Sequence, residues 1–396
     1  MHSQRNLVWF SVAVLLSAVL AFSGCSRKDQ AENTADGALI IKIGQVSPLT
    51  GPQAHLGRDN DNGARLAIDE ANVRGVTLGG QKVKFVLLSE DDQADPKTAT
   101  IVAQKLVDAQ VKGVIGHLNS GTSIPASKIY YDAGIPQISP SATAIKYTDQ
   151  GFKTAFRTMT NDRQQGRVLG EFLVKKMGGK RVAIIDDRTA YGQGLADEVE
   201  KAVKASGGEL VAREYTSDKV MDFSAILTSI KGKNPDVVFF GGMDPQGAPM
   251  AKQMQSLGLK AKFLGGDGLQ TPEFLKLAGA AAEGATASSP GLPIDGMPGG
   301  KAFRDKFTAK YGVIQNYAPY VYDAVTAMIT AMEKAGSAEP AKYLAELPNI
   351  HFTGVTGEIG FDAKGDVLGG AITLYRVKAG KWQVVETVVS GAAPKK

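Results

Sequence analysis

Three short segments of the chain place hydroxyl or carboxyl groups among small residues, each directly after a run typical of a β-strand. They are residues 118–123 (LNSGTS), 139–143 (SPSAT) and 265–268 (GGDG). The first precedes an expected helix start at Ile124, where free backbone N–H groups and the helix dipole favour an anion such as a carboxylate. The Ser120 hydroxyl in this segment would serve equally well as a cap of that helix, and spacing alone leaves both interpretations open.

Two further residues could meet the other end of a small zwitterion. Asp267 lies between glycines, so its backbone could approach a ligand closely while its carboxylate meets a cation such as an α-ammonium group. Tyr191 follows another predicted strand and sits just before a predicted helix, which would place its ring at the mouth of the second half. Each has an ordinary alternative, namely a turn aspartate and a surface-packed tyrosine, and Thr143 taken alone reads as a turn hydroxyl.

No segment matches a nucleotide-binding or nucleophile motif. The chain has no G-x-x-x-x-G-K-[ST] loop, the run 192–194 (GQG) lacks the third glycine of a dinucleotide fingerprint, and Ser120 lacks the flanking glycines of a nucleophile elbow. The four histidines are scattered without metal-ligand spacing: His2, His55, His117 and His351. We therefore expect no enzyme, no catalytic residue, no cofactor and no metal site.

Length and composition are those of a globular protein with two lobes. A chain of 396 residues can form two domains of ordinary size, and 43% hydrophobic with 21% charged residues excludes a disordered chain. The formal charge of +5 is not concentrated in a basic block or in a basic stripe interleaved with aromatic residues. Nucleic acid is therefore excluded as the expected partner.

The first 25 residues are expected to be a signal peptide. Arg5 precedes an apolar run over 7–22 that is short for a membrane span, and the run closes on LAFSGC, ending at Cys25. This end resembles a bacterial lipoprotein signal, with Phe22 where leucine is usual, which predicts lipidation of Cys25. Ordinary cleavage after residues 21–23 would instead leave Cys25 as a free thiol. As the only cysteine, it permits no intramolecular disulfide, and the polar stretch 26–38 reads as a flexible tether.

From Leu39 onward, short β-branched runs alternate with amphipathic stretches. The first half predicts strands at 40–43, 83–88, 114–116 and 136–138, with helices at 63–73, 96–110 and 124–132. The rhythm restarts near 158–161, with strands at 181–185 and 236–240 and helices at 163–177, 195–205, 249–257, 272–277, 300–311 and 320–335. This alternation predicts an α/β fold of two doubly wound sheets, with any ligand beyond the carboxyl ends of the strands.

The loops resemble those of the leucine/isoleucine/valine-binding proteins, the type I periplasmic binding proteins of branched-chain amino acid ABC transporters. The likeness spans nearly all of residues 39–389 and lies in the order of the segments more than in any one of them. The segments are Gly44 with 48–52 (PLTGP), Asp91-Asp92 with Asp95-Pro96, 114–118 (VIGHL) with Ser120, 125–127 (PAS), 140–143 (PSAT), 191–194 (YGQG), Gly241-Gly242, and Phe361-Asp362 with 364–366 (KGD).

The resemblance implies a site for an amino acid between the lobes. Ser120 and Thr143 would hold the ligand carboxylate with nearby N–H groups, and the Ser141 carbonyl would help to hold the ammonium. Asp267 would neutralise the ammonium from the other lobe, and Tyr191 would close over the amino-acid backbone. The implied ligand-binding set is Leu56, Leu118, Ser120, Ser141, Ala142, Thr143, Tyr191, Met243 and Asp267.

The resemblance also implies two Rossmann-like lobes that close about a hinge of three crossings, near Thr160, Pro290 and Thr356. The expected boundaries are 1–25 for the signal, 26–38 for the tether, 39–160 with 290–355 for lobe 1, and 161–289 with 356–390 for lobe 2.

Several positions depart from relatives. Ala94 and Asn119 stand where some relatives carry a disulfide, and Leu56 and Met243 stand where aromatic residues often line the side-chain pocket. Asp267 replaces a commoner glutamate, and one methylene in an apolar pocket alters preference by roughly 10- to 200-fold. These departures leave the preferred amino acid open.

The implied function is that of an extracytoplasmic substrate-binding protein, periplasmic or in the cell envelope. It would deliver an amino acid of the leucine/isoleucine/valine type to an ABC permease and ATPase complex. A monomer is expected, held at the membrane by a lipid if Cys25 is modified. The alternatives are binding of a small amide, a urea-like compound or another amino acid by the same fold, and a sensory receptor role.

Overall fold

The computed structural model describes residues 33–389, and its strands form two main sheets. The first has six strands in the order β2-β3-β1-β4-β5-β6, and all its pairs are parallel except β2 with β3. Its strands are β1 (Leu39–Ser47), β2 (Thr77–Leu78), β3 (Gln81–Asp91), β4 (Val114–Gly116), β5 (Gln137–Ser139) and β6 (Ala155–Arg157). Its helices are α1 (Ala54–Arg74), α2 (Pro96–Asp108), α3 (Ser120–Asp132) and α4 (Lys146–Asp149).

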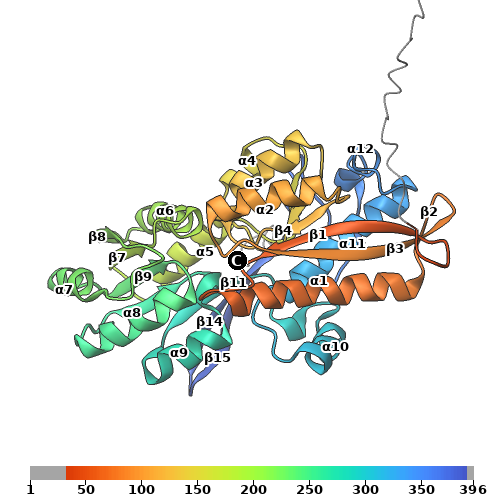
Figure 1. Cartoon of the computed structure of the whole chain (residues 1–396). Coiled ribbons are helices and arrows are strands. Elements are labelled where there is room, and N and C mark those ends of the chain that lie inside the picture. The colour runs from red at the N-terminus through yellow and green to blue at the C-terminus, as the bar shows by residue number, and fades with distance from the viewer. Residues whose placement is uncertain (1–32, 390–396) are drawn as a thin grey trace, which may run out of the picture. The chain divides into compact units, whose positions relative to one another are not determined.

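The second sheet has seven strands and repeats the same winding. Its order is β15-β14-β11-β10-β9-β7-β8, with an antiparallel hairpin of β14 and β15 added at the β11 edge. The strands are β7 (Arg181–Asp186), β8 (Glu209–Tyr215), β9 (Val237–Gly241), β10 (Lys262–Gly265), β11 (Thr286–Pro290), β14 (Ala371–Lys378) and β15 (Lys381–Val389). Its helices are α5 (Asp162–Lys175), α6 (Ala190–Ala205), α7 (Ser224–Gly232), α8 (Asp244–Ser256) and α9 (Pro272–Ala278). Figure 1 shows this group beside the long strands β1 and β3 and helix α1.

The remaining elements connect or cover the two sheets. The longer helices α10 (Gly300–Tyr311) and α11 (Ala318–Ala335) follow β11, and α11 packs its buried face into the core of the first sheet. The short elements are α12 (Pro340–Tyr343), the β12–β13 pair (Phe352–Thr353 with Glu358–Ile359), and the 3-10 turns η1 (Asp267–Leu269), η2 (Gly279–Ala282), η3 (Ile294–Gly296) and η4 (Leu347–Asn349). Ahead of β1, Asn33 forms an isolated bridge with Leu39.

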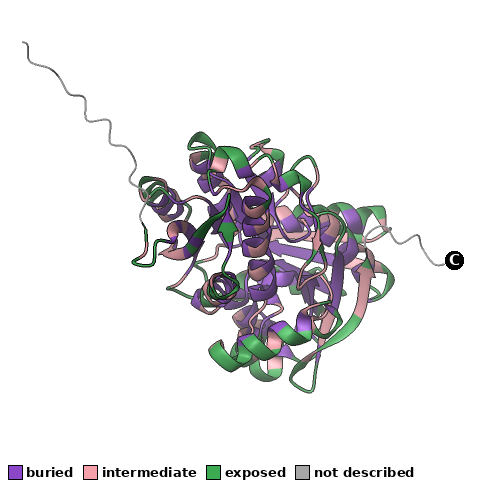
Figure 2. Cartoon of the chain, turned by 90° about the vertical axis from the view of Figure 1, so that its right-hand side faces the viewer, coloured by how far each residue is buried: buried purple, intermediate pink, exposed green. Residues whose placement is uncertain are grey.

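Both sheets are covered by helices on both faces, and this explains why their strands read as continuous apolar runs. In β7, Val182 and Ile184 point into one buried cluster while Ala183 and Ile185 point into another. Side chains alternate across a strand, so a run without polar residues supplies both cores at once. Figure 2 shows the consequence, with buried strands inside and exposed residues gathered on outer helix faces and loops.

The predicted α/β architecture of two doubly wound sheets is confirmed, and the strands that the sequence did not reveal are mainly β8, β11, β14 and β15. The chain leaves the first sheet after Arg157 and returns after Pro290. Ile359 and Phe361 still pack in the core of the first sheet, whereas β14 begins at Ala371. The third passage of the chain between the two sheets therefore lies between Phe361 and Ala371, later than the predicted crossing near Thr356. The lobe boundaries themselves stay a prediction.

Some predicted helices begin too late. Helix α1 begins at Ala54, and α8 begins at Asp244 with Pro249 inside it. Helix α3 begins at Ser120, four residues before the predicted start at Ile124. Short polar stretches hide these first turns, because their residues have weak helix propensity and are held by tertiary contacts. Within residues 33–389, no helix combines the length and the apolar character needed to cross a membrane.

Candidate functional site

The predicted site residues all follow carboxyl ends of strands, on the side where ligands of open α/β sheets bind. In the first sheet, β4 leads to Ser120 and β5 leads to Thr143. In the second sheet, β7 leads to Tyr191 in the first turn of α6, and β10 leads to Asp267 in the turn η1. The helix predicted from Leu195 begins instead at Ala190, because Thr189 caps it with its side chain. Tyr191 therefore lies inside the helix and not just before it.

The two polar loops of the first sheet are tied to each other. The Ser120 Oγ accepts a hydrogen bond from the Ala144 N–H at 3.1 Å, and the Ser141 Oγ donates to the Leu118 carbonyl at 2.9 Å. Because Asn119 occupies the N-cap position of α3, the Ser120 hydroxyl is not the cap that the alternative interpretation required. A hydroxyl that accepts one hydrogen bond still has its proton to donate, so Ser120 keeps a donor for a ligand acceptor.

Asp267 is wholly buried and surrounded by neutral donors. Its Oδ1 accepts from Gln165 Nε2 at 2.7 Å and from the Tyr191 hydroxyl at 2.9 Å, and its Oδ2 accepts from the Tyr317 hydroxyl at 2.7 Å. Burial raises the pKa of the Asp267 carboxyl, and the three hydrogen bonds oppose that rise. The carboxylate is thus oriented by three side chains, none of which supplies a positive charge.

Tyr317 reaches Asp267 from the side of the first sheet. It stands at the N-cap of α11, where the buried Asp59 of α1 accepts backbone N–H bonds from each residue of 315–318, at 2.9 to 3.2 Å. The Asp59 carboxylate satisfies N–H groups that helix geometry leaves unpaired, and thereby fixes the Tyr317 ring. Tyr317 is not recognisable as a site residue from the sequence, since nothing in its spacing reveals which strand end it faces.

Asp162 is the second carboxylate of the site, and the sequence analysis missed it too. It begins α5, its backbone N–H donates to the Thr143 carbonyl at 2.9 Å, and it is wholly buried. Its carboxylate forms no ion pair with any described residue, and the Thr143 hydroxyl, which has no partner of good geometry, lies near enough to act on it. Burial, and next the negative charge of Asp267, raise the pKa of Asp162 to about 8, although the Thr143 hydroxyl and the positive charge of Arg157 oppose that rise. A carboxyl group with so strongly raised a pKa is a candidate for pairing with a bound cation.

Most apolar residues of the predicted set lie together, but Ala142 packs in a separate cluster with Tyr147 and Ala155. Leu56 and Leu118 from the first sheet pack in one buried cluster with Tyr191 and Met243 from the second, and Tyr317 belongs to the same cluster. A cavity of about 460 Å³ opens next to it, lined by Gln53, Asn119 and Gly121 on one side and by Asp187, Tyr191 and Met243 on the other. The site thus has an apolar wall built from both sheets.

The arrangement suits a small molecule with a cationic group, a hydrogen-bonding group and an apolar group. Two buried carboxylates and the Thr143 hydroxyl offer acceptors for an ammonium, because buried negative charge is stabilised by a paired positive charge. Among the described residues, no group of three or more His, Cys, Asp and Glu side chains could hold a metal ion. Cys25 lies outside those residues.

A clue to Asp162 was present in the sequence but was not decisive. Asn161 and Asp162 directly precede a predicted helix, as N-cap residues do. Such residues normally face water, and only the packing of two sheets against each other buries this carboxylate.

The sequence and the fold both match known proteins. Residues 40–381 match the model of a family described as periplasmic binding protein. The leucine-, isoleucine-, valine-, threonine- and alanine-binding protein of Pseudomonas aeruginosa is 36% identical over 366 residues, which cover 91% of this chain and 94% of that protein.

Two solved structures are similar over most of the chain. The leucine-binding protein LivK of Thermotoga maritima has a TM-score of 0.82 at 28% identity, covering 88% of this chain and 98% of that one. The branched-chain amino acid transporter substrate-binding protein LivJ of Streptococcus pneumoniae, solved with isoleucine, has a TM-score of 0.79 at 29% identity, covering 88% and 99%.

Proposed function

Because the chain belongs to the periplasmic binding protein family, we propose that it is the substrate-binding protein of an ABC importer and takes an α-amino acid with an aliphatic side chain. The family role is binding and not catalysis, and it places the protein outside the cytoplasm. Relatives named for leucine, isoleucine and valine support this ligand class.

The observation that carries the proposal is the buried Asp162 carboxyl group, which forms no ion pair with any described residue. It lies near the Thr143 hydroxyl and within the influence of the Asp267 charge. An α-ammonium group would give both carboxylates a counter-charge, while the Thr143 hydroxyl could accept from the ammonium and donate its own proton to the ligand carboxylate. A neutral amide or urea-like ligand would supply no counter-charge to the buried Asp267, and Asp162 would keep its proton below its pKa of about 8.

The other groups fit the rest of an amino acid. We assign the ligand carboxylate to the hydroxyls of Ser120 and Thr143 and to the Thr143 backbone N–H, because the other N–H groups of the loop already donate to Ser139 and Ser120. We assign the ammonium to Asp267, Asp162 and the Ser141 carbonyl. Tyr191 would lie over the ligand backbone. The side chain would face Leu56, Leu118, Ala142 and Met243.

The partners and the location follow from the proposed role. We propose delivery to a permease and ATPase complex by a monomeric protein, held at the membrane through a lipid on Cys25. The expected signal over 1–25 and the tether over 26–38 belong to the same proposal.

Isothermal titration calorimetry tests the proposal. The protein is unfolded and refolded to remove carried-over ligand, then titrated with leucine, isoleucine, valine, alanine, phenylalanine and a small amide. We expect saturable binding of an aliphatic amino acid, weakened at least about tenfold by Asp267→Asn and by Asp162→Asn, since hydrogen bonds to charged groups contribute about 1.5–3 kcal/mol.

Asp305→Asn is the matched control, because this exposed carboxylate of α10 pairs only with surface residues Lys301 and Arg304. Its affinity should equal that of the unchanged protein. Silence with every amino acid and a response to the amide would overturn the ligand assignment.

A further inference from the structure

We propose that Arg157 is a positioning residue that orients the ligand-carboxylate loop 141–144 and, through Asp366 and Asn161, links this loop to two of the passages between the sheets. Arg157 ends β6, and its side chain is wholly buried. The proposal rests on the function proposed above, because it takes this loop to hold the ligand carboxylate.

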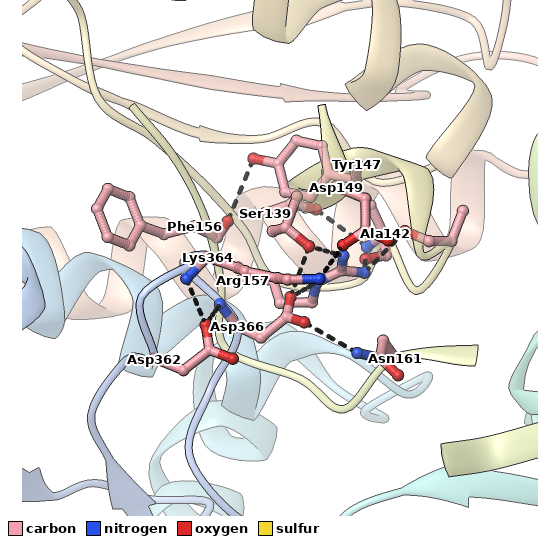
Figure 3. A network of polar contacts seen from close by, with 12 residues as sticks. Ser139, Ala142, Tyr147, Asp149, Phe156, Arg157, Asn161, Asp362, Lys364 and Asp366 are labelled. Atoms are coloured by element: carbon pink, nitrogen blue, oxygen red, sulfur yellow. Dashed lines mark hydrogen bonds and ion pairs between the residues drawn. The ribbon is translucent and has the colours of Figure 1, made fainter. Parts of the chain in front are cut away.

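The Arg157 guanidinium hydrogen-bonds to the loop on both sides of Thr143. Its Nη1 donates to the carbonyls of Ala142 and Ala144, at 2.7 and 3.1 Å. The carbonyl between them, on Thr143, is held by the backbone N–H of Asp162 at 2.9 Å. Three consecutive carbonyls are therefore engaged by the segment that starts the first passage to the second sheet. Figure 3 shows Arg157 among Ala142, Asp366 and the other residues of this network.

Because each peptide group is planar, the hydrogen bonds from Arg157 also fix the direction of the neighbouring N–H groups of the loop. In a planar trans peptide, the N–H of one residue points opposite to the carbonyl of the residue before it. Because the Ala142 carbonyl points at Arg157, the Thr143 N–H points away from Arg157. The Ile145 N–H points away from Arg157 for the same reason, since Arg157 also holds the Ala144 carbonyl. Arg157 thus sets which side of the loop presents donors.

Asp366 connects Arg157 to the segments of the chain that pass between the two sheets. Its Oδ1 accepts from Arg157 Nε at 2.6 Å, and its Oδ2 accepts from Asn161 Nδ2 at 2.9 Å. Asn161 in turn is the N-cap of α5, the helix that begins with Asp162. The Asp366 carboxylate therefore binds both Arg157, which contacts the loop, and Asn161, the N-cap of the helix that begins with Asp162.

The turn that bears Asp366 is itself docked on β6. The Arg157 N–H donates to the Gly365 carbonyl at 2.9 Å, and Asp362 accepts from the Asp366 N–H at 3.0 Å. Gly365 has a φ of +96°, and a Cβ there would meet the Ala155 carbonyl at 2.2 Å. Only glycine therefore allows the turn to lie this close to the strand. Because the turn and the strand are in direct contact, a movement of the third passage would displace β6.

The buried charge of Arg157 is matched by these contacts. Asp366 supplies the opposite charge, Thr148 Oγ1 accepts from Nη2 at 2.7 Å, and the Tyr147 ring lies 5.3 Å from the guanidinium carbon. A lysine cannot reproduce this pattern, because it has one nitrogen and lacks the planar fork.

The test compares Arg157→Lys and Asp366→Asn with Lys364→Gln. The Lys364 control lies in the same turn but pairs with the exposed Asp149 on the surface. Each protein is titrated with the preferred amino acid and with the amino alcohol of the same side chain, which keeps the ammonium and lacks the carboxylate. A thermal melt checks that each variant is folded.

We expect Arg157→Lys and Asp366→Asn to weaken the amino acid about tenfold or more and the amino alcohol less than about threefold, so the preference for the carboxylate shrinks. The Lys364→Gln control should keep both affinities. Equal loss of both ligands in folded variants would overturn the proposal, because it would show a general structural role.

A ligand-free measurement separates this proposal from the proposed function. Hydrogen exchange of the unliganded proteins should show faster exchange in residues 141–145 and 158–163 together in both variants, and not in the control. If no amino acid binds the unchanged protein, the function proposal fails while this result still decides the link between loop and hinge. Unchanged exchange in these segments would refute the link.

Discussion

At the residue scale, the site is defined by two buried carboxylates that form no ion pair with any described residue. Asp267 accepts from three neutral donors, whereas Asp162 has only the nearby Thr143 hydroxyl and the more distant charge of Arg157 to offset its burial. Such a group stabilises a bound cation at the expense of the stability of the empty protein. The two roles of Asp162 can therefore be separated by one substitution.

We predict that Asp162→Asn raises the Tm of the ligand-free protein by a few degrees and removes the Tm increase caused by the amino acid. The pKa of Asp162 is about 8 in the folded chain and near its ordinary value when unfolded. Between these values the folded form holds a proton that the unfolded form has lost, so this carboxylate makes stability fall as pH rises from about 4 to about 8.

Melting curves from pH 5 to 8 measure the effect. The variant should lose this part of the decline with pH, while Asp305→Asn should keep it. A lower Tm for Asp162→Asn at pH 7.5 would contradict the account of an unpaired buried charge.

At the scale of elements, helix termini meet across the two sheets. His55 in the first turn of α1 contacts Asp244 at the start of α8, with 2.7 Å between Nε2 and Oδ2. The same Asp244 oxygen accepts from Thr271 at 2.6 Å, and Glu273 and Asp59 add further negative charge near His55. This pair joins a helix of the first sheet to a helix of the second.

Affinity for the ligand should therefore depend on pH through His55. Burial lowers the pKa of His55, but the hydrogen bond and charge of Asp244 outweigh it, and the pKa lies above the ordinary 6.5. The protonated pair stabilises the closed arrangement fully below the pKa of the free histidine, and this stabilisation is lost as pH rises through the raised pKa.

We predict that deprotonation of His55 weakens binding as pH rises from about 6 to 8, by at most about tenfold per pH unit for one proton, while ionisation of Asp162 acts in the opposite direction over the same range. His55→Asn should remove the weakening component, so that affinity rises more steeply with pH than in the unchanged protein. His351→Asn is the control, because His351 is exposed and pairs with Glu358 beside it. An identical pH profile in His55→Asn and in the unchanged protein would rule out this cross-sheet pair as a source of pH dependence.

Elements also differ in how well the sequence predicted them. Strands buried on both faces, such as β7 and β9, were found from their apolar runs, and helices α9 and α10 were found within one residue. The starts of α1, α3 and α8 were not found, since their first turns are polar and are fixed by distant partners. Asp59, for example, is a charged residue of a kind expected at the surface of a helix, yet it is buried because it accepts hydrogen bonds from backbone N–H groups at the start of α11.

At the scale of the whole molecule, binding should be coupled to approach of the two sheets. Residues of both sheets share one apolar cluster, and the neighbouring cavity of about 460 Å³ is lined from both sides but not by the polar groups assigned to the ligand. Those groups also come from both halves, since Ser120 and Thr143 follow strands of the first sheet and Asp267 follows a strand of the second. The proposed site is therefore complete only when the two sheets are close. Hinge closure around a ligand is a common mode of such population shift.

Distances between spin labels test the closure. Cys25 is the only cysteine, so a Cys25→Ala background allows labels at Lys97→Cys and Lys219→Cys, exposed sites on opposite sides of that cavity. We expect the mean distance to shorten when the amino acid is added. A pair at Lys219→Cys and Lys276→Cys, both beside the second sheet, should stay constant. An unchanged distance in the first pair at saturating ligand would contradict closure.

The sequence by itself determined the fold class, the two tandem halves and the strand ends that carry Ser120, Thr143, Tyr191 and Asp267, because buried parallel strands and the loops after them are local patterns. The tertiary structure decided which groups share the site. Asp162, Gln165 and Tyr317 come from helix starts whose local pattern predicts solvent-exposed positions, and only packing of the two sheets buries them beside Asp267 and Thr143. Arg157 likewise reads as a strand end, and its grip on the loop exists only because a turn some two hundred residues later supplies Asp366 as its counter-charge.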